Sequence, residues 1–398
     1  MTENKNNLRA LTGGAAVAEA WRQIDPEVVC AYPITPQTPI IETFAQLVAA
    51  GRVSSEVILA ESEHSALSAI VGASAAGVRA LTATSSQGLA YMAEILWVAA
   101  GLRLPIVMAV AARALSAPIN IHGDHSDVMG FRDAGWIQLF CETAQEAYDL
   151  SLLAVRLAED KKVLLPTMVI QDGFFTSHNV EPVKIYDDAA VRQILGERQA
   201  EYGLLNFEKP VSYGPLALPN YFFEIKYQQQ QAMAQVPAAL ETVAGEFKNL
   251  LGQKYAWCEE YQMEDAEYAL VVMGSAAGTA KDAVDELRAQ GQPVGMVKIR
   301  LYRPFQYLAL AQILQNCAGV AVLDRAMAPG AQAPLVSDVR LALSSLKSAP
   351  LVSSYIYGLG GRDLYPEEIK NVFADLKHTP RGQAREQNQT EKYLGLRD

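Results

Sequence analysis

Residues 57–88 read VILAESEHSALSAIVGASAAGVRALTATSSQG, and this stretch indicates how the chain folds. The start VILAES and the later run ALTATSS have the apolar, β-branched composition of buried strands. Between them, apolar residues recur at helical spacing from Ser65 to Ala76. A strand, a helix and a second strand in succession are typical of a parallel β-sheet, because parallel neighbours need a long crossover connection.

The same alternation extends from residue 8 to about residue 180. Further strand candidates are VVCAYPI (28–34), PIVMAVAAR (105–113) and LLPTMVIQD (164–172). Further helices are predicted at Thr38–Ala50, Gly88–Gly101 and Thr143–Glu159. The fold class is therefore α/β, with a parallel sheet covered by helices on both faces. Open sheets of this kind bind ligands beyond the carboxyl ends of their strands.

A second α/β unit follows a change of pattern. Residues 206–240 contain several prolines, aromatic residues and a run of four glutamines, which predicts an irregular crossing segment, and a helix is expected from Ala238 to Glu260. From residue 265 strands and helices alternate again. We expect domains at 1–240 and 265–376, a helical linker at 241–264 and, at 377–398, a polar tail that is disordered or lies on a partner.

Composition narrows the classes of function. The chain has 398 residues, half of them apolar, which is enough for two domains. Its formal net charge is -11 with scattered basic residues, so nucleic acid is not an expected partner. The N-terminal stretch is polar, and no apolar run reaches the roughly 18 residues of a membrane span. We therefore expect a cytoplasmic protein that does not contact a membrane.

The four cysteines, Cys30, Cys141, Cys258 and Cys317, lie far apart in the sequence. Iron–sulfur and structural zinc sites need closely spaced thiolates, and no C-x-x-C pair occurs. We expect buried reduced thiols and no metal site in this chain.

Each predicted strand of the first domain ends in a polar cluster, which suggests one cleft. The clusters are YPITP (32–36), ESEH (61–64), TSSQG (84–88) and Arg113 with the following GDH (123–125). The alternative is that such residues cap the next helices, and this is our interpretation of Ser85, Ser86 and Thr38.

Within these clusters several roles remain open. The two prolines of YPITP fix a turn that holds Thr35 in place, although many turns are rich in proline for structural reasons. Glu61, Glu63 and His64 either stabilise the start of a helix or include a carboxylate held in a partly apolar pocket. The guanidinium of Arg113 either binds a substrate carboxylate through two parallel hydrogen bonds or pairs with an acid of the 124–133 loop.

The second unit contains a glycine-rich turn, Gly274–Thr279, between a strand and a helix. It resembles a phosphate-binding loop but matches neither of the two common nucleotide motifs. We therefore interpret it as a site of close strand–helix packing.

Taken together, the motifs resemble the alpha subunits of the multi-subunit 2-oxoacid:ferredoxin oxidoreductases. The matching stretches are AYPITPQTPIIE (31–42), residues 61–94, LRLPIVMAVAARALSAPINIHGDHSD (102–127), RDAGWIQ (132–138), VLLPTMVIQDGFFTSH (163–178), VKIRLYRPF (297–305), VLDRAMAPG (322–330) and GLGGRD (358–363). The resemblance implies a pyrimidine-binding thiamine-diphosphate domain followed by a transketolase C-terminal-like domain.

The resemblance also implies cofactors and partners. The alpha chain holds the aminopyrimidine of thiamine diphosphate, while a beta subunit holds the diphosphate through Mg²⁺. The chain agrees with this division, since it lacks the GDG pattern of a Mg²⁺–diphosphate site. Gamma and ferredoxin-like delta subunits are implied as well, with [4Fe-4S] clusters on partner subunits, coenzyme A as co-substrate and ferredoxin as electron acceptor.

By the same resemblance, Glu63 matches the residue that hydrogen-bonds the pyrimidine ring nitrogen and so favours the tautomer that removes the cofactor proton. Ser86, Gln87 and Gly88 are expected beside that ring. Thr35 and Arg113 match residues that hold the carbonyl and carboxylate ends of the oxoacid.

One departure from the multi-subunit relatives is NIHGDHSD, which is nearer to the single-chain pyruvate enzymes. It suggests that His122, Asp124 and His125 line the substrate pocket, although a structural loop is the alternative.

The expected activity is oxidative decarboxylation of pyruvate with coenzyme A to acetyl-CoA and CO₂. Within the same chemistry, a branched-chain 2-oxoacid, 2-oxoglutarate or oxalate is the alternative substrate. Oxalate is a dianion, which a second cationic residue in the site would hold better. The neutral Thr35 in that place therefore argues against oxalate. A non-catalytic scaffold subunit is the rival of another class, and it would need neither Glu63, Thr35 nor Arg113.

Overall fold

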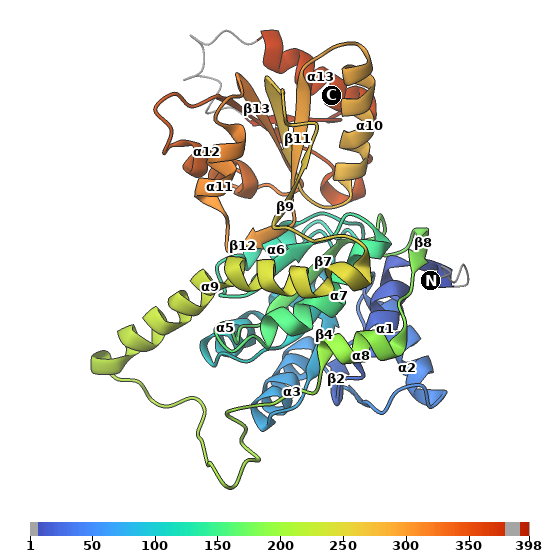
Figure 1. Ribbon diagram of the computed structural model, residues 1–398, viewed down its shortest axis with the longest axis vertical. Coiled ribbons are helices and arrows are strands. Elements are labelled where there is room, and N and C mark those ends of the chain that lie inside the picture. Colours follow the sequence, from blue (N-terminus) through green and yellow to red (C-terminus); the bar gives the residue numbers. More distant parts are fainter. Residues whose placement is uncertain (1–6, 379–390, 398) are drawn as a thin grey trace.

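The computed structural model describes residues 7–378 and 391–397. It contains two large β-sheets, one in each of two α/β units that are stacked end to end (Figure 1). A third, small sheet pairs β1 (Leu8–Thr12) with β8 (Val180–Lys184) in antiparallel fashion.

The first unit is built on a seven-stranded sheet with the order β12-β6-β7-β5-β4-β2-β3. Its strands are β2 (Val28–Ala31), β3 (Glu56–Leu59), β4 (Ala80–Thr84), β5 (Val107–Ala112), β6 (Ile137–Phe140), β7 (Thr167–Asp172) and β12 (Leu301–Arg303). All neighbours are parallel except β12, which runs antiparallel to β6. The parallel sheet predicted from the alternating pattern is confirmed.

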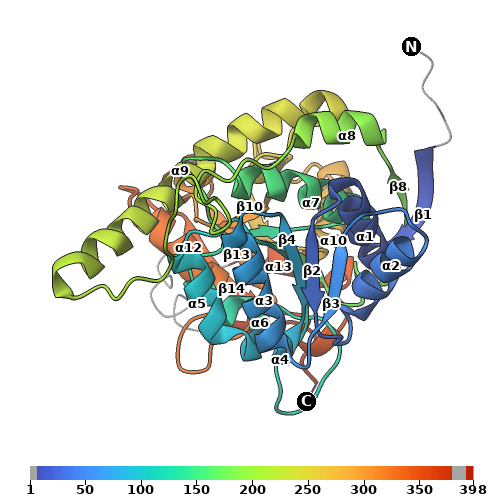
Figure 2. The ribbon, with the colours of Figure 1, turned by 90° about the horizontal axis from the view of Figure 1, so that it is seen from below.

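Helices cover both faces of this sheet, as predicted. One face is covered by α1 (Gly13–Ile24), α2 (Thr38–Ala49), α7 (Ala144–Ala158), α8 (Asp188–Leu195) and part of α9 (Pro219–Leu251). The other is covered by α3 (Glu63–Ala76), α4 (Ser86–Tyr91), α5 (Ala93–Gly101) and α6 (Ser126–Gly130). Figure 2 shows α1 and α2 on one side of β2 and β4, with α3 and α5 on the other. The predicted helix Gly88–Gly101 is two helices in the structure, divided at Met92.

The second unit has a six-stranded sheet with the order β15-β14-β13-β10-β11-β9. Its strands are β9 (Cys258–Tyr261), β10 (Tyr268–Val272), β11 (Val294–Ile299), β13 (Gly319–Asp324), β14 (Leu351–Ile356) and β15 (Glu391–Tyr393). Its helices are α10 (Ala276–Ala289), α11 (Tyr307–Leu314), α12 (Pro334–Leu343) and α13 (Pro366–His378), with a short 3₁₀ turn at Leu359–Gly361. Helices α10 and α13 pack on one face, and α11 and α12 on the other.

Strand β12 connects the two units. It follows β11 of the second sheet but pairs with β6 of the first. The ring of Tyr302, in the middle of β12, packs edge-on against Phe140, with ring centroids 6.0 Å apart. A single apolar core runs from the first sheet through this junction into the second unit. The two units therefore share backbone pairing as well as buried surface.

The segment between the units differs from the prediction. The irregular segment expected at 206–240 is helical from Pro219 onward, and α9 ends at Leu251 rather than at Glu260. Proline fits the first turn of a helix, whereas Pro237 lies inside α9. Buried side chains of the C-terminal half, such as Val243 and Phe247, pack into the first core and offset the hydrogen bond lost at Pro237.

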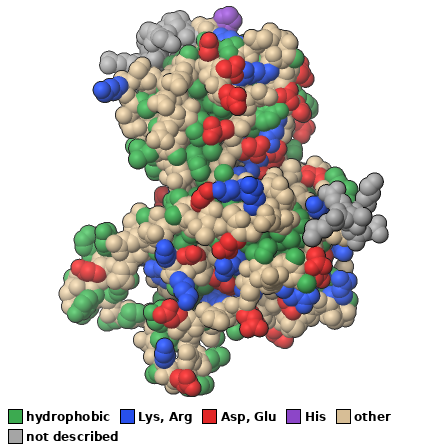
Figure 3. Space-filling model, viewed as in Figure 1, with side chains coloured by type: hydrophobic (Ala, Val, Ile, Leu, Met, Phe, Trp, Pro, Cys, Tyr) green, Lys and Arg blue, Asp and Glu red, His purple; other side chains and the backbone are tan. Residues whose placement is uncertain are grey.

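The N-terminal half of α9 projects from the body together with the loop before it (Figure 1). Its aromatic side chains Tyr221, Phe222 and Phe223 are exposed, and hydrophobic side chains cover the tip of the projection (Figure 3).

The structure also bears on the predictions for the cysteines and for the polar tail. All four cysteines are buried and free, as expected. Residues 391–393 form β15, so this part of the predicted polar tail is ordered within a sheet; 379–390 and 398 lie outside the described residues.

Within the described ranges, no helix is both long enough and apolar enough to cross a membrane.

Candidate active site

The predicted site residues follow neighbouring strands of the first sheet. Strands β2, β4 and β5 are adjacent and parallel, so their carboxyl ends lie at one edge. Thr35 follows β2, Ser86 follows β4 and Arg113 follows β5 directly. Glu63 lies in the first turn of α3, the helix that follows β3. The sheet thus brings most of the predicted residues to a common edge.

Glu63 is a buried carboxylate without a protein partner. Its helix begins at Ser62, whose hydroxyl accepts a hydrogen bond from the Ser65 amide and so caps α3 in place of an acid. Glu63 is only 8% exposed. No donor or cation among residues 7–378 and 391–397 contacts its carboxylate. Neither carboxylate oxygen is sealed from solvent, so the group is free to accept a hydrogen bond from a bound ligand.

Gly88 lets the backbone at the start of α4 pack closely against the side chains of Glu63 and Thr84. A Cβ atom on Gly88 would lie 2.8 Å from Oε1 of Glu63 and 2.5 Å from Oγ1 of Thr84. The Thr84 hydroxyl is itself buried and without a partner in the described part of the chain. A polar ring that donates to a carboxylate, such as a protonated aminopyrimidine, fits this set of groups. Thiamine diphosphate is therefore compatible with the residues present.

The turn at Ser86 is held by hydrogen bonds and not by helix capping. Ser86 has a positive φ of 49°, and its hydroxyl donates to the Ala114 carbonyl at 2.6 Å. The Ser85 hydroxyl donates to the carbonyl of Ala111, likewise at 2.6 Å. Neither serine caps α4 through its side chain, and α2, which begins at Thr38, also lacks a side-chain cap. The capping interpretation of Ser85, Ser86 and Thr38 is therefore wrong.

Arg113 is a buried cation bound only by carbonyl oxygens. Its Nη1 donates to the Thr35 carbonyl and its Nε to the Asn120 carbonyl, both at 2.8 Å. Burial lowers the pKa of Arg113, and the charge of Asp127 opposes this shift. No carboxylate of the described residues lies within ion-pair distance of the guanidinium. The ion pair with the 124–133 loop is thus not formed, and the positive charge is left for another anion.

The YPITP turn brings Thr35 to this cation. The Thr35–Pro36 peptide bond is cis, and the carbonyl group of Thr35 is the oxygen that accepts from Arg113. Gln37 closes the turn through its side-chain oxygen, which accepts from the Ile34 amide at 3.2 Å. The turn predicted to position Thr35 is therefore tied directly to Arg113.

Asp124 and His125 contact the second unit. One oxygen of Asp124 accepts from the Gly360 amide at 3.1 Å. The His125 ring lies 2.6 Å from a carboxylate oxygen of Asp172, which also binds Arg325 at 2.8 Å. His125 is 1% exposed, so the structure places it in a buried network between the units.

The remaining predicted residues lie around the same loop. His122 is exposed, and its ring packs against Phe174 with centroids 4.9 Å apart. The side-chain oxygen of Gln87 lies 2.6 Å from the Ser86 hydroxyl oxygen. His64 lies 3.5 Å from Glu94 near the exposed end of α3.

The glycine-rich turn Gly274–Thr279 also packs closely, as interpreted, but its partner is the first unit. Gly274 has a φ of 69°, and a Cβ there would lie 2.8 Å from the Asp172 carboxylate. The Ser275 amide donates to the same carboxylate at 2.9 Å. The turn thus binds an internal anion, the side chain of Asp172.

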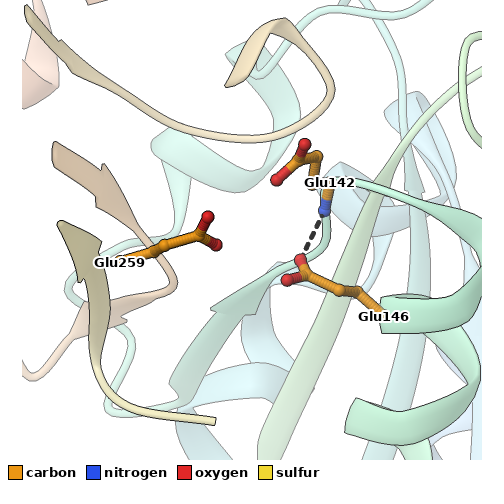
Figure 4. Close-up of side chains that lie close together, drawn as sticks. All are labelled: Glu142, Glu146 and Glu259. Carbon is orange, nitrogen blue, oxygen red and sulfur yellow. Dashed lines mark hydrogen bonds between the residues drawn. The ribbon is translucent and has the colours of Figure 1, made fainter. Parts of the chain in front are cut away.

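A separate acidic group lies at the junction of the units. Glu142 and Glu146 at the start of α7 and Glu259 of β9 direct their carboxylates toward one centre (Figure 4). Lys298 Nζ occupies that centre, 2.5 Å from Glu142, 2.9 Å from Glu146 and 2.6 Å from Glu259. The ammonium group stands where a metal cation would bind.

Two further cations complete this network, since Lys281 and Arg300 also contact its carboxylates. Although burial favours the protonated acid, the charges of Arg300 and Lys298 lower the pKa of Glu146 to about 2. Three cations therefore balance three carboxylates, and the network joins the two units.

Replacing Lys298 by methionine should destabilise the protein by about 3–5 kcal/mol, because it leaves buried carboxylates without their central cation. The matched control is Lys370→Met, which removes an ion pair with Glu286 and Glu367 at the surface. Urea unfolding of both variants measures the difference. Equal losses would contradict the structural role of the network.

Comparison with known proteins identifies the family. Residues 19–245 match the family model described as pyruvate flavodoxin/ferredoxin oxidoreductase, thiamine diphosphate-binding. Residues 266–369 match pyruvate:ferredoxin oxidoreductase core domain II. The chain belongs to the pyruvate:ferredoxin oxidoreductase family. The resemblance noted from the sequence motifs is therefore confirmed.

Within the pyruvate:ferredoxin oxidoreductase family, the similar curated proteins are subunits. Pyruvate synthase subunit PorA of Thermotoga maritima is 54% identical over 98% of this chain and 98% of its own length. Pyruvate synthase subunit PorA of Pyrococcus abyssi is 43% identical over 96% of both. Ketoisovalerate oxidoreductase subunit VorA of the same organism is 40% identical over 95% of both.

A solved structure supports the fold of this family member. The 2-oxoglutarate:ferredoxin oxidoreductase from Magnetococcus marinus superposes with a TM-score of 0.74 at 19% identity, over 93% of this chain and 65% of that chain. At this identity the likeness concerns the fold alone.

Several residues around the site were not singled out by sequence. Asn120 and Asp172 hold the loop that follows β5, and Asp127 was considered only as a partner for Arg113. Asp172 ends the predicted strand LLPTMVIQD, so its position at a strand end was an available signal. Asn120 and Asp127 act through contacts between distant segments, which sequence does not display.

Proposed function

We propose that this chain is the alpha subunit of a pyruvate:ferredoxin oxidoreductase and that it contributes the pyrimidine-binding half of a shared active site. The observation that carries this proposal is Glu63, whose carboxylate has no donor among the described residues and lies near the buried, unpartnered hydroxyl of Thr84. The reaction is oxidative decarboxylation of pyruvate with coenzyme A to acetyl-CoA and CO₂. The electrons pass to ferredoxin.

Glu63 holds the proton of the pyrimidine ring nitrogen in this proposal. A carboxylate accepts that proton in a charge-assisted hydrogen bond, which is stronger than one between neutral groups. Ser86, Gln87 and Gly88 form the first turn of α4, which packs against Glu63 and which we propose to lie beside the ring. Thiamine diphosphate, when bound, supplies a nucleophilic carbon for the 2-oxo group and accepts the electrons of decarboxylation.

Arg113 and Thr35 orient the oxoacid. The guanidinium lacks a carboxylate partner within the protein, so it can bind the carboxylate of pyruvate. The Thr35 turn lies against the same side chain and faces the carbonyl end of the substrate. Asp124 and His125 support the loop that bounds this side of the pocket. Orientation before bond breaking is a large part of such catalysis.

Partner subunits complete the enzyme. The sequence has no GDG motif for a Mg²⁺–diphosphate site, which we assign to a beta subunit. The four cysteines are buried and widely separated in sequence, so we also assign the [4Fe-4S] clusters to partners. The relatives' designation as subunits supports this division. Beta, gamma and ferredoxin-like delta subunits are the proposed partners.

A branched-chain 2-oxoacid is the second candidate substrate. Ketoisovalerate oxidoreductase subunits are among the similar proteins, at 40% identity. Pyruvate is favoured because the pyruvate synthase subunit of Thermotoga maritima is 54% identical over nearly the whole chain.

The test is an assay of the complex purified from its native source. We expect reduction of ferredoxin or a viologen dye with pyruvate and coenzyme A, and much slower reduction with 2-ketoisovalerate, 2-oxoglutarate or oxalate. The isolated chain should be colourless and inactive because the clusters lie on partners. Stoichiometric iron in the isolated chain would contradict the division between subunits. Full activity of a complex carrying Glu63→Ala would favour a scaffold.

A further inference from the structure

Asp127 is a fully buried carboxylate that ties two parts of the candidate site together. It lies in α6, has no exposed surface, and follows the loop that contacts the second unit. One of its oxygens, Oδ2, accepts from the Ser86 amide at 2.8 Å and from the Arg113 amide at 3.0 Å. The other accepts from the Val128 amide at 2.7 Å. A single oxygen thus holds Ser86, which follows β4, and Arg113, which follows β5.

We propose that Asp127 is a positioning residue, which holds the Arg113 anchor in register with the Ser86–Gly88 turn so that substrate and cofactor meet in the correct geometry. This inference rests on the proposed function, which places the substrate at Arg113 and the cofactor at the Ser86–Gly88 turn. Asp127 itself contacts neither ligand. The second link between the same segments is the hydrogen bond from the Ser86 hydroxyl to the Ala114 carbonyl. Both links join the turn after β4 to the chain at the end of β5.

The geometry makes the connection sensitive to small changes. Oδ2 of Asp127 binds two amides from the segments that follow β4 and β5, so its displacement moves both segments. Ser86 has a φ of 49°, a conformation that residues other than glycine seldom adopt without support. Misplacement of reacting groups by about 1 Å can reduce a rate about a hundredfold. Asp127 is therefore placed to influence both substrate binding and cofactor binding.

Asp127→Asn tests this role with little change in volume. The amide can present its oxygen either to Ser86 and Arg113 or to Val128, and its NH₂ group then faces an N–H donor on the other side. In the assembled complex we expect the KM for pyruvate and the dissociation constant of thiamine diphosphate to rise together, each about tenfold. The second quantity is measured by titration of the cofactor-free complex and does not depend on turnover.

Asp324→Asn is a matched control in the second unit. The Asp324 carboxylate is also buried and accepts from the amides of Leu335 and Val336 at 2.8 and 3.0 Å. Burial raises the pKa of both Asp127 and Asp324 to about 7. We expect the control to lower the melting temperature as much as Asp127→Asn does, while its KM for pyruvate and its cofactor affinity stay within about twofold of the parent.

The outcomes separate this inference from the function on which it rests. If Asp127→Asn lowers only the melting temperature, as its control does, the positioning role is overturned. If Arg113→Lys leaves the pyruvate kinetics unchanged, the proposed role of Arg113 as substrate anchor fails, whereas a complex that does not oxidise pyruvate at all contradicts the proposed function itself. A kinetic effect of Arg113→Lys without one of Asp127→Asn rejects the present inference alone.

A second variant keeps the test open should Asp127→Asn not fold. Ser86→Gly removes the hydroxyl that binds the Ala114 carbonyl, and glycine accepts the positive φ at this position. A rise of the KM for pyruvate by a fewfold supports the coupling between the turn and Arg113. An unchanged KM in a folded complex refutes it.

Discussion

Glu63→Gln is expected to lower the turnover of the assembled enzyme by about 10²–10⁴-fold, the range typical of a lost acid–base group. The amide has nearly the same shape as the carboxylate, so the close packing against Gly88 is preserved and we expect the cofactor still to bind. It carries no negative charge, however, and cannot stabilise a protonated ring nitrogen. The rate of proton exchange at C2 of the bound cofactor measures this step directly.

Glu61→Gln is the matched control for this change. Glu61 is two residues away, lies at the surface and binds the Ser65 hydroxyl, with no contact to Gly88. The control should exchange the proton and turn over within about twofold of the parent. Exchange at a near-normal rate in Glu63→Gln would show that another residue holds the proton.

Arg113→Lys is expected to reduce kcat/KM for pyruvate about ten- to a hundredfold. Lysine keeps the charge but loses the planar fork, so two parallel hydrogen bonds to a carboxylate become one less directional contact. A hydrogen bond to a charged group contributes about 1.5–3 kcal/mol, which corresponds to that loss. Arg113→Ala should reduce kcat/KM further. Steady-state kinetics and melting temperatures of both variants provide the measurement.

Arg103→Lys serves as the control for Arg113→Lys. Arg103 is also partly buried and bound only by carbonyl oxygens, those of Val163 and Leu164. It precedes β5, whereas Arg113 follows it, so the two lie at opposite ends of one strand. Loss of stability in both variants, with kcat/KM unchanged in both, would reduce Arg113 to a structural role.

The sequence was sufficient to predict those parts of the fold that depend on local pattern. Buried parallel strands are continuous apolar runs, so β4, β5 and β7 could be recognised, and their polar ends marked the edge where Glu63 and Arg113 lie. These features require only neighbours in sequence.

Features that depend on distant contacts could not be predicted. The C-terminal half of α9 was predicted as a helix, but its N-terminal half was missed, because a proline inside a helix is unfavourable and Pro237 is tolerated here only through packing of the C-terminal half into the core. The role of Ser86 was misread because its hydroxyl binds Ala114, which belongs to another strand end. Asp127 shows the same limitation, since its role depends on contacts with two segments, one after β4 and one after β5.

Strand β12 has a consequence for how this chain can be divided. A shortened chain that ends before residue 265 would leave β6 with an unpaired edge and remove Tyr302 from the ring of Phe140. Free strand edges beside apolar surface promote aggregation. The boundary between the two family-model matches is therefore no point of safe cleavage. A gene fusion or recombination event that keeps the first sheet must therefore also keep residues 301–303, which form its edge strand β12.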